Sequence, residues 1–144
     1  LKIISSYDVF LVVKGFHSNT TRGMKNEGFV IDEETPTSML IRDADAVIYI
    51  ATSSALEGYV RGKEMLQLSY LHGNQTSLEQ SGNGLMARSR DDVHLFMNHF
   101  AKNGTFTSPS DTDLNDKARS FILDRIVGDN PKGEYLDLLN QIAG

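Results

Sequence analysis

The chain of 144 residues is 40% hydrophobic and 23% charged, which suits one globular domain that buries roughly 68–70% of its unfolded surface. Its formal net charge of -5 with scattered lysines and arginines argues against a nucleic-acid-binding face, and the absence of cysteine excludes disulfides and thiolate metal sites. No apolar run approaches the ~20 residues that span a membrane and no signal peptide is visible, so we expect a cytoplasmic protein.

The first part of the chain predicts two strands separated by a polar loop. Residues 9–13 (VFLVV) form a continuous apolar run, typical of a strand covered on both faces. This strand ends at the segment from Lys14 to His17. Residues 18–28 are polar and contain two glycines, which predicts a loop before a short strand at 29–31.

A helix is expected next, starting at Thr35 and Pro36. Threonine is a common helix cap and proline is favoured at the first helical position. The helix should reach about Arg42 and bury Met39 and Leu40.

The centre of the sequence predicts a strand, a helix and a second strand in close succession. Residues 46–50 (AVIYI) indicate a fully buried strand, and residues 65–68 a second strand. The helix between them presents three apolar side chains on one face: Leu56, Tyr59 and Val60. Gly62 should end this helix. So short a connection implies a parallel crossover between the two strands.

The remaining sequence is mostly helical in its patterning. Residues 71–82 predict a loop with one helical turn near 77–80, and residues 84–87 a short strand. Three further helices are expected at 91–102, 113–127 and around 135–142. Strands alternating with helices predict an α/β fold with an open, mostly parallel sheet. In such sheets, ligands bind beyond the carboxyl ends of the strands.

The turn Thr52-Ser53-Ser54 is the strongest candidate for a ligand site. It stands where a strand passes into a helix, and unpaired N–H groups at a helix start favour a phosphate. The simpler interpretation of these serines is a helix cap.

Glu57 follows one turn later and could face the same ligand. Gly58 beside it is costly in a helix, by about 1 kcal/mol relative to alanine, which suggests a close approach by another group. The alternative is a surface ion pair between Glu57 and Arg61 four residues on.

Lys14, His17 and His72 also follow predicted strands at the end where sites form. A lysine supplies a point charge for phosphate, and a histidine supplies a donor or acid near neutral pH. The alternative for all three is an ordinary surface loop. The four histidines show no metal-ligand spacing, so no metal site is expected.

Four stretches together resemble one enzyme family. They are VVKGFH (12–17), DADAVIYIATSSALEGYVRGKEML (43–66), LEQSGNGLMARSRDDVHLFM (78–97) and ARSFILDRIVGDNPKGEYLDLLNQIA (118–143). In this order they resemble the C-terminal, nucleotide-binding half of GT-B glycosyltransferases. The closest likeness is to bacterial surface-polysaccharide and CDP-glycerol glycerophosphotransferase-type enzymes. Glu64 stands where that family has proline.

The resemblance implies a three-layer, Rossmann-like open parallel sheet with helices on both faces. It implies that residues 1–144 are one nucleotide-sugar-binding domain that lacks the N-terminal acceptor domain and is inactive alone. It further implies that Ser53 and Ser54 bind the phosphates of a UDP- or CDP-linked donor with the help of Lys14 and His17, and Thr52 is a candidate through its place in the same turn. Glu57 would then approach the ribose.

The same resemblance implies further roles and partners. His17 would act at the leaving phosphate. The position of His72 after the strand 65–68, rather than the resemblance, suggests that it contacts the base or sugar. The nucleotide-activated donor is a substrate, so no cofactor is expected. The expected partners are this donor and the N-terminal domain, and nucleic acid is not expected to bind. Any association with a membrane would occur only through the N-terminal domain.

Two other functions fit the same sequence pattern. A non-hydrolysing UDP-sugar 2-epimerase shares the architecture, although its Thr-Asp-Ser-Gly-Gly and Arg-Pro-Glu segments are missing here. A non-catalytic α/β module that binds a nucleotide or another protein is the third possibility. Failure of the purified domain to bind any nucleotide would favour the module, whereas binding of UDP or CDP that is lost in Glu57→Ala would favour transfer chemistry.

Overall fold

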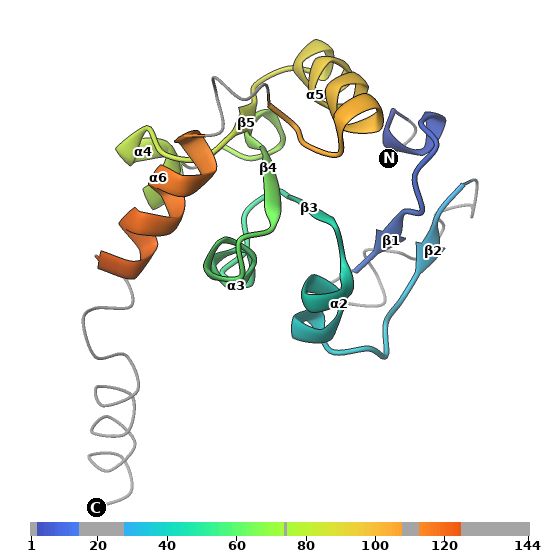
Figure 1. Cartoon of the computed structure of the whole chain (residues 1–144), viewed down its shortest axis with the longest axis horizontal. Helices are drawn as coiled ribbons and strands as arrows, with labels where there is room; N and C mark the ends of the chain where they lie inside the picture. The colour runs from blue at the N-terminus through green and yellow to red at the C-terminus, as the bar shows by residue number, and fades with distance from the viewer. Residues whose placement is uncertain (1–2, 15–27, 74, 108–112, 125–144) are drawn as a thin grey trace, which may run out of the picture.

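The computed structural model describes residues 3–14, 28–73, 75–107 and 113–124, which form a mixed α/β structure (Figure 1). The helices and strands in chain order are η1 Ile4–Ser6, β1 Val12–Val13, β2 Val30–Ile31, α2 Thr37–Asp43, β3 Ala46–Tyr49, α3 Ala55–Val60, β4 Glu64–Leu68, η2 Ser69–Leu71, α4 Ser77–Ser81, β5 Met86–Ala87, α5 Arg90–Asn103 and α6 Asp113–Ile122. The helix expected around 135–142 lies outside the described residues. Within those residues, no helix is both long enough and apolar enough to cross a membrane.

The first two strands, β1 and β2, form a small parallel sheet of their own. Val12 pairs with Val30, and Val13 pairs with Ile31. The strand is shorter than the apolar run 9–13, and Phe10 within that run is 85% exposed. The prediction that the run is covered on both faces is therefore wrong for the described residues.

The second sheet contains β3, β4 and β5 in that order, all parallel. Tyr49 at the end of β3 pairs with Gln67, which in turn pairs with Met86 of β5. The predicted parallel crossover from β3 through α3 to β4 is confirmed. Because all three strands run the same way, the segments that follow them leave the sheet at one edge.

β4 lies at the centre of this sheet and separates two apolar clusters. Met65, Leu66 and Gln67 are completely buried. Leu66 belongs to a cluster with β5, α5 and η1, whose buried members are Ile4, Leu85, Ala87, Val93, Met97 and Phe106. Met65 belongs to a second cluster with α3, α4 and α6, whose other buried members are Tyr49, Ala55, Tyr59, Leu78, Ala118 and Ile122. Successive side chains of a strand point to opposite faces of the sheet, so Met65 and Leu66 belong to different clusters.

β3 is less buried than its sequence predicted. Only Tyr49 is fully buried, the other strand residues are half-buried, and Ile50 is 44% exposed. The expectation of a fully buried strand is wrong, because β3 has β4 on one side and no hydrogen-bonded strand on the other among the described residues.

The start of α2 differs from the prediction by one residue. Thr37 is the first helical residue, and Pro36 is the cap with an extended ψ of 137°. Asp32 explains the shift, because its Oδ1 accepts the N–H of Thr35 at 2.8 Å and organises the turn before the helix. Of the two residues expected to be buried, Met39 is 43% exposed and Leu40 is half-buried, and the buried residue of α2 is Ile41.

Helix α3 buries most of the predicted face, since Leu56 packs half-buried against the core, but Val60 does not belong to it. Tyr59 is buried as expected, but Val60 is 37% exposed, and Ala55 and Gly58 are buried in its place. A methyl group added at Gly58 would lie 2.5 Å from the Sδ of Met65. The close approach that this glycine predicted is confirmed, and the approaching group is a core side chain.

Helix ends elsewhere follow the sequence closely. Gly62 after α3 and Gly104 after α5 have positive φ angles of 69° and 73°, as expected of glycines that end helices. Ser89 caps α5 by accepting the N–H of Asp92 at 3.1 Å. These local signals therefore fix the ends of α3 and α5.

Candidate functional site

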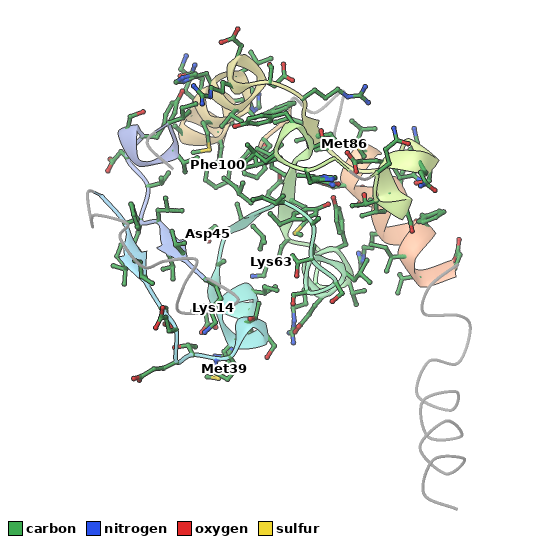
Figure 2. All side chains as sticks on the ribbon, turned by 180° about the vertical axis from the view of Figure 1, so that it is seen from behind. Lys14, Met39, Asp45, Lys63, Met86 and Phe100 are labelled. Atoms are coloured by element: carbon green, nitrogen blue, oxygen red, sulfur yellow. The ribbon has the colours of Figure 1, made fainter. Side chains whose placement is uncertain are left out.

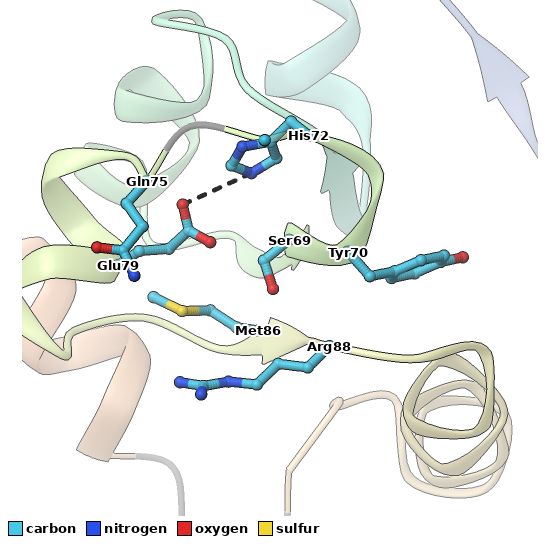
Figure 3. A pocket seen from close by; sticks show the side chains of 8 residues that line it. Ser69, Tyr70, His72, Gln75, Glu79, Met86 and Arg88 are labelled. Atoms are coloured by element: carbon cyan, nitrogen blue, oxygen red, sulfur yellow. Dashed lines mark ion pairs between the residues drawn. The ribbon is translucent and has the colours of Figure 1, made fainter.

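A pocket of about 230 Å³ lies beyond the carboxyl ends of β4 and β5 (Figure 3). Its walls come from η2 and the loop after it, from α4, and from β5 and its exit. The lining residues are Ser69, Tyr70, His72, Gly73, Gln75, Glu79, Met86 and Arg88. The pocket therefore occupies the edge of a parallel sheet at which α/β proteins bind ligands.

The short helix α4 positions Glu79 in this pocket. Thr76 and Glu79 form a reciprocal capping box: the Thr76 hydroxyl accepts the Glu79 N–H at 3.3 Å, and the Glu79 carboxylate accepts the Thr76 N–H at 2.7 Å. Two N–H groups that a helix start leaves unpaired are thereby satisfied. The capping box fixes the Glu79 carboxylate where it faces His72.

His72 lies 3.5 Å from this carboxylate, measured from Nε2 to Oε2 (Figure 3). Both side chains are largely covered, with 13% and 11% of their surface exposed. The same Nε2 lies 3.1 Å from the Nε2 of Gln67. His72 is thus held from two sides, by strand β4 and by helix α4.

Gln67 connects the pocket to the interior of the protein. Its side chain is completely buried, and its Oε1 accepts a hydrogen bond from the Tyr49 hydroxyl at 3.3 Å. Tyr49 is in turn 3.1 Å from the hydroxyl of Tyr59. Burial is the main cause that raises the pKa of Tyr49 and of Tyr59 above the ordinary tyrosine value, so both remain protonated.

Arg88, Ser69 and Gln75 are the other polar side chains of the lining. Among the described lining residues, Arg88 carries the only permanent positive charge. The Ser69 hydroxyl donates to the carbonyl of Ala87 at 3.0 Å, which ties the end of β4 to the end of β5. The pocket thus combines a cation, a carboxylate and an imidazole with the apolar surfaces of Tyr70 and Met86.

Of the predicted site residues that the structure describes, only His72 lines this pocket. Thr52 and Ser53 are exposed and Ser54 is half-buried, in the turn after β3 at the same edge of the sheet. The N–H of Ser54 donates to Thr52 Oγ1 at 3.3 Å. The next three N–H groups donate to the carbonyls of Thr52, Ser53 and Ser54 at 3.0–3.2 Å. The N–H groups of residues 54–57, expected to be unpaired, are therefore all bonded within the turn, and binding of phosphate there is still only a prediction.

Glu57 and Lys14, which the structure describes, do not line the pocket. The Glu57 carboxylate is paired with Arg61, 2.8 Å from its Nε and 2.7 Å from its Nη2, which is the surface ion pair considered above. Lys14 is half-buried at the exit of β1. The pKa of the Asp32 carboxyl lies below its usual value, mainly because Thr35 donates hydrogen bonds to it. The positive charge of Lys14 adds a smaller effect in the same direction. His17 lies outside the described residues.

Two residues of the stretch 43–66, which carries part of the family resemblance, make hydrogen bonds that stabilise the fold. Lys63, labelled in Figure 2, donates from Nζ to the carbonyl of Arg42 at 2.7 Å and so covers the end of α2. Glu64, where the resembled family has proline, accepts the N–H of Phe106 at its Oε2, 3.1 Å away. This contact gives the carboxylate a role in fixing the loop after α5.

Sequence reasoning missed several residues of the site, and three of these matter most: Gln67, Glu79 and Arg88. Two of them had a signal. Gln67 is a polar residue inside an otherwise apolar strand, and Thr76-x-x-Glu79 is a capping-box pattern. Nothing local distinguished Arg88, because its place in the pocket depends on the pairing of β5 with β4.

Comparison with known proteins adds no assignment. No protein-family model matches the sequence, and no curated protein or solved structure is a match.

Proposed function

We propose that this chain binds a UDP- or CDP-linked donor. It would be the donor-binding half of a glycosyl- or glycerophosphotransferase in surface-polysaccharide or teichoic-acid-like biosynthesis. The observation that carries this proposal is the pocket beyond the carboxyl ends of β4 and β5. In this proposal both small sheets belong to one Rossmann-like, three-layer domain, and a second domain supplies the acceptor. The chain alone would bind the donor without transferring its group.

The order of the strands supports a donor that spans two adjacent strand ends. Tyr49 of β3 is paired with Gln67 of β4. The turn 52–54 and the segment 69–73 therefore follow neighbouring strands at the same edge. A pocket of about 230 Å³ holds one end of such a donor, the base or the sugar. The diphosphate would then extend toward the turn at Ser53 and Ser54.

The proposed chemistry relies on electrostatic stabilisation of the leaving nucleotide. Charge develops on the leaving phosphate during transfer, and fixed positive groups aimed at it lower the barrier. Lys14 and His17 would supply such groups, with His17 also able to donate a proton. Glu57 would leave Arg61 and accept hydrogen bonds from the ribose.

Two alternatives keep the same pocket. A 2-epimerase-like domain would also bind a UDP-sugar at this edge. A non-catalytic module would use the pocket for recognition only. The parallel crossover at the pocket is common to all three, and the Ser-Ser turn followed by Glu57 favours the transferase.

Calorimetric titration with UDP and CDP tests the proposal. Wild-type protein should bind at least one of them, and Arg88→Ala should weaken binding about tenfold or more, because the pocket loses its cation. Arg90→Ala is the matched control, since this exposed arginine at the start of α5 does not line the pocket. If neither nucleotide binds, the transferase and epimerase proposals both fail and the module remains.

A second pair of variants tests the role of Glu57. Glu57→Ala removes the carboxylate, and Arg61→Ala removes only its partner in the ion pair. If the carboxylate binds ribose, nucleotide affinity falls in the first variant and is kept in the second. Equal nucleotide affinities in the two variants would show that Glu57 does not bind ribose and takes part only in the surface ion pair.

A further inference from the structure

Glu79 brings a carboxylate oxygen without a partner to the pocket. Its Oε2 accepts the N–H of Thr76 at 2.7 Å and lies 3.5 Å from His72 Nε2. Its Oε1 has no hydrogen-bond or ion-pair partner in the part of the chain that the structure describes, and it is not one of the buried unsatisfied atoms found there. Oε1 is therefore open to a ligand, although only 11% of the side chain is exposed.

A carboxylate that is covered to this extent favours a ligand that compensates its charge. Taking a charge out of water is costly unless an opposite charge or hydrogen bonds replace the water. Within the described residues, His72 is the only basic side chain that approaches Glu79 as an ion-pair partner. An ordinary histidine is neutral at about pH 8. Under that condition no permanent positive charge of these residues is paired with Glu79.

Arg88 brings the opposite charge to the same pocket. Its backbone N–H donates to Asp92 Oδ2 at 2.7 Å, but its guanidinium forms no hydrogen bond or ion pair with another described residue. A guanidinium presents its N–H donors in a planar fork that matches the oxygens of a phosphate or a carboxylate. The exposed Arg88 side chain is thus free to bind an anionic group.

The two charges stand apart and do not neutralise each other. No ion pair joins Glu79 to Arg88, although both line the pocket. Figure 3 shows Met86 between them. The pocket therefore presents a negative group on one side, a positive group on the other and an apolar surface between. A matching ligand has a cationic and an anionic group joined by a short apolar linker.

We propose that the group transferred from the donor carries a protonated amine, which Glu79 Oε1 binds, and that Arg88 binds the phosphate next to this group. The substrate class is then a nucleotide-linked amino alcohol or amino sugar instead of a neutral polyol or sugar. This inference rests on the proposed function, because it identifies which end of the donor enters the pocket. The pocket holds the transferred group, and the rest of the diphosphate extends toward Ser53 and Ser54.

An amine suits Glu79 better than a hydroxyl does. Both groups can donate a hydrogen bond to Oε1, but only the protonated amine also neutralises the carboxylate. The attraction between the two charges adds to the hydrogen bond and is offset only in part by desolvation of the amine. We therefore expect the amine-bearing ligand to bind about fivefold or more tightly than its hydroxyl-bearing counterpart.

Two pairs of ligands test this preference by calorimetry at about pH 8, where a primary amine is protonated. Phosphoethanolamine and hydroxyethyl phosphate differ only in an amine for a hydroxyl, and they probe the pocket alone. CDP-ethanolamine and CDP-glycerol probe the complete donor. Wild-type protein should prefer the amine in each pair. This comparison needs no variant, so the inference stays testable even if a variant does not fold.

Glu79→Gln tests which residue gives the preference. Glutamine can replace glutamate in a capping box, so the variant removes the charge and keeps the local structure. Affinity for the amine ligands should fall about fivefold or more, and affinity for the hydroxyl ligands should stay nearly unchanged. A purely structural role of Glu79 would weaken both kinds alike. Asp91→Asn is the matched control, because this exposed carboxylate does not line the pocket. Arg88→Ala should weaken both members of each pair.

Equal affinities within each pair overturn the inference, and the proposed function then survives if CDP-glycerol binds. A preference for the amine that persists in Glu79→Gln also overturns it. If no CDP or UDP compound binds but phosphoethanolamine binds with the expected preference, the proposed function fails, whereas the roles of Glu79 and Arg88 in the pocket are supported. If none of these ligands binds, both proposals fail.

Discussion

Gly84 offers a direct test of how tightly the buried tyrosines are packed. Its φ of 84° lies in the left-handed region, and an added methyl group would stand 2.8 Å from the Tyr59 hydroxyl oxygen. The change Gly84→Ala therefore adds two costs. The backbone conformation costs an alanine about 1–2 kcal/mol, and forcing a methyl group into a packed core costs roughly 1–3 kcal/mol. We expect a total loss of about 2–5 kcal/mol in the free energy of unfolding.

Gly104→Ala is the matched control. Its φ is 73°, but nothing lies within 4 Å of the added methyl group, so it should lose only the backbone cost of about 1–2 kcal/mol. Tyr59→Phe removes the clashing oxygen, and the next atoms around Gly84 are then at 3.6 and 3.7 Å, which is ordinary contact. In that background, Gly84→Ala should cost no more than Gly104→Ala does in the wild type.

Urea unfolding followed by circular dichroism measures all of these variants. The slope of unfolding free energy against urea should stay constant, so that shifts of the midpoint report stability. If Gly84→Ala and Gly104→Ala cost the same, or if Tyr59→Phe does not relieve the first, the contact between Gly84 and Tyr59 does not have the strength assigned to it.

Three further changes have definite expected outcomes. Gly58→Ala should destabilise the protein by up to about 2 kcal/mol through its clash with Met65. In a Met65→Ala background the same change should stabilise the protein by about 1 kcal/mol, as helix propensity predicts. If urea unfolding shows that Gly58→Ala changes the stability in the same direction in both backgrounds, this reasoning is wrong. Glu64→Leu should cost about 1–3 kcal/mol because the N–H of Phe106 loses its acceptor, whereas Glu64→Gln keeps one and should cost less in the same assay. The pKa of Asp32 is lower in the folded protein than its unfolded value near 3.8, so the ionised carboxylate stabilises the fold above that pH, and this stabilisation is lost as the pH falls through the folded pKa. Asp32→Asn should therefore be less stable than the wild type at neutral pH, and acid-unfolding curves should show this difference shrink.

The sequence predicted the central unit of the fold well, because its signals are local. An apolar run, a glycine with a positive φ and a short connection were enough to place β3, α3 and β4 and to make them parallel. The faces of α3 were predicted less well. Val60 fits a helical stripe as well as Tyr59 does, and only the packing of α6 and Met65 around α3 decides that Gly58 is buried and Val60 exposed.

The sequence predicted at which edge of the sheet the candidate site lies, but not most of the residues that form it. Strand order places His72 and the turn 52–54 at that edge, and both were expected there. The pocket wall also needs Glu79 and Arg88, which reach it through the capping box of α4 and the register of β5. Gln67 follows Tyr49 by 18 positions, and their hydrogen bond exists because β3 and β4 pair in one register. Contacts of this kind depend on tertiary structure and leave no local pattern.

The central position of β4 has a consequence for how the molecule opens. Leu66 faces one apolar cluster, while Met65 faces the other. Neither cluster can come apart without exposing a side of this strand, so the two should be lost in one cooperative event. Amide protons of β4 should accordingly exchange with solvent more slowly than those of β1 and β2, whose exchange needs only local fluctuation.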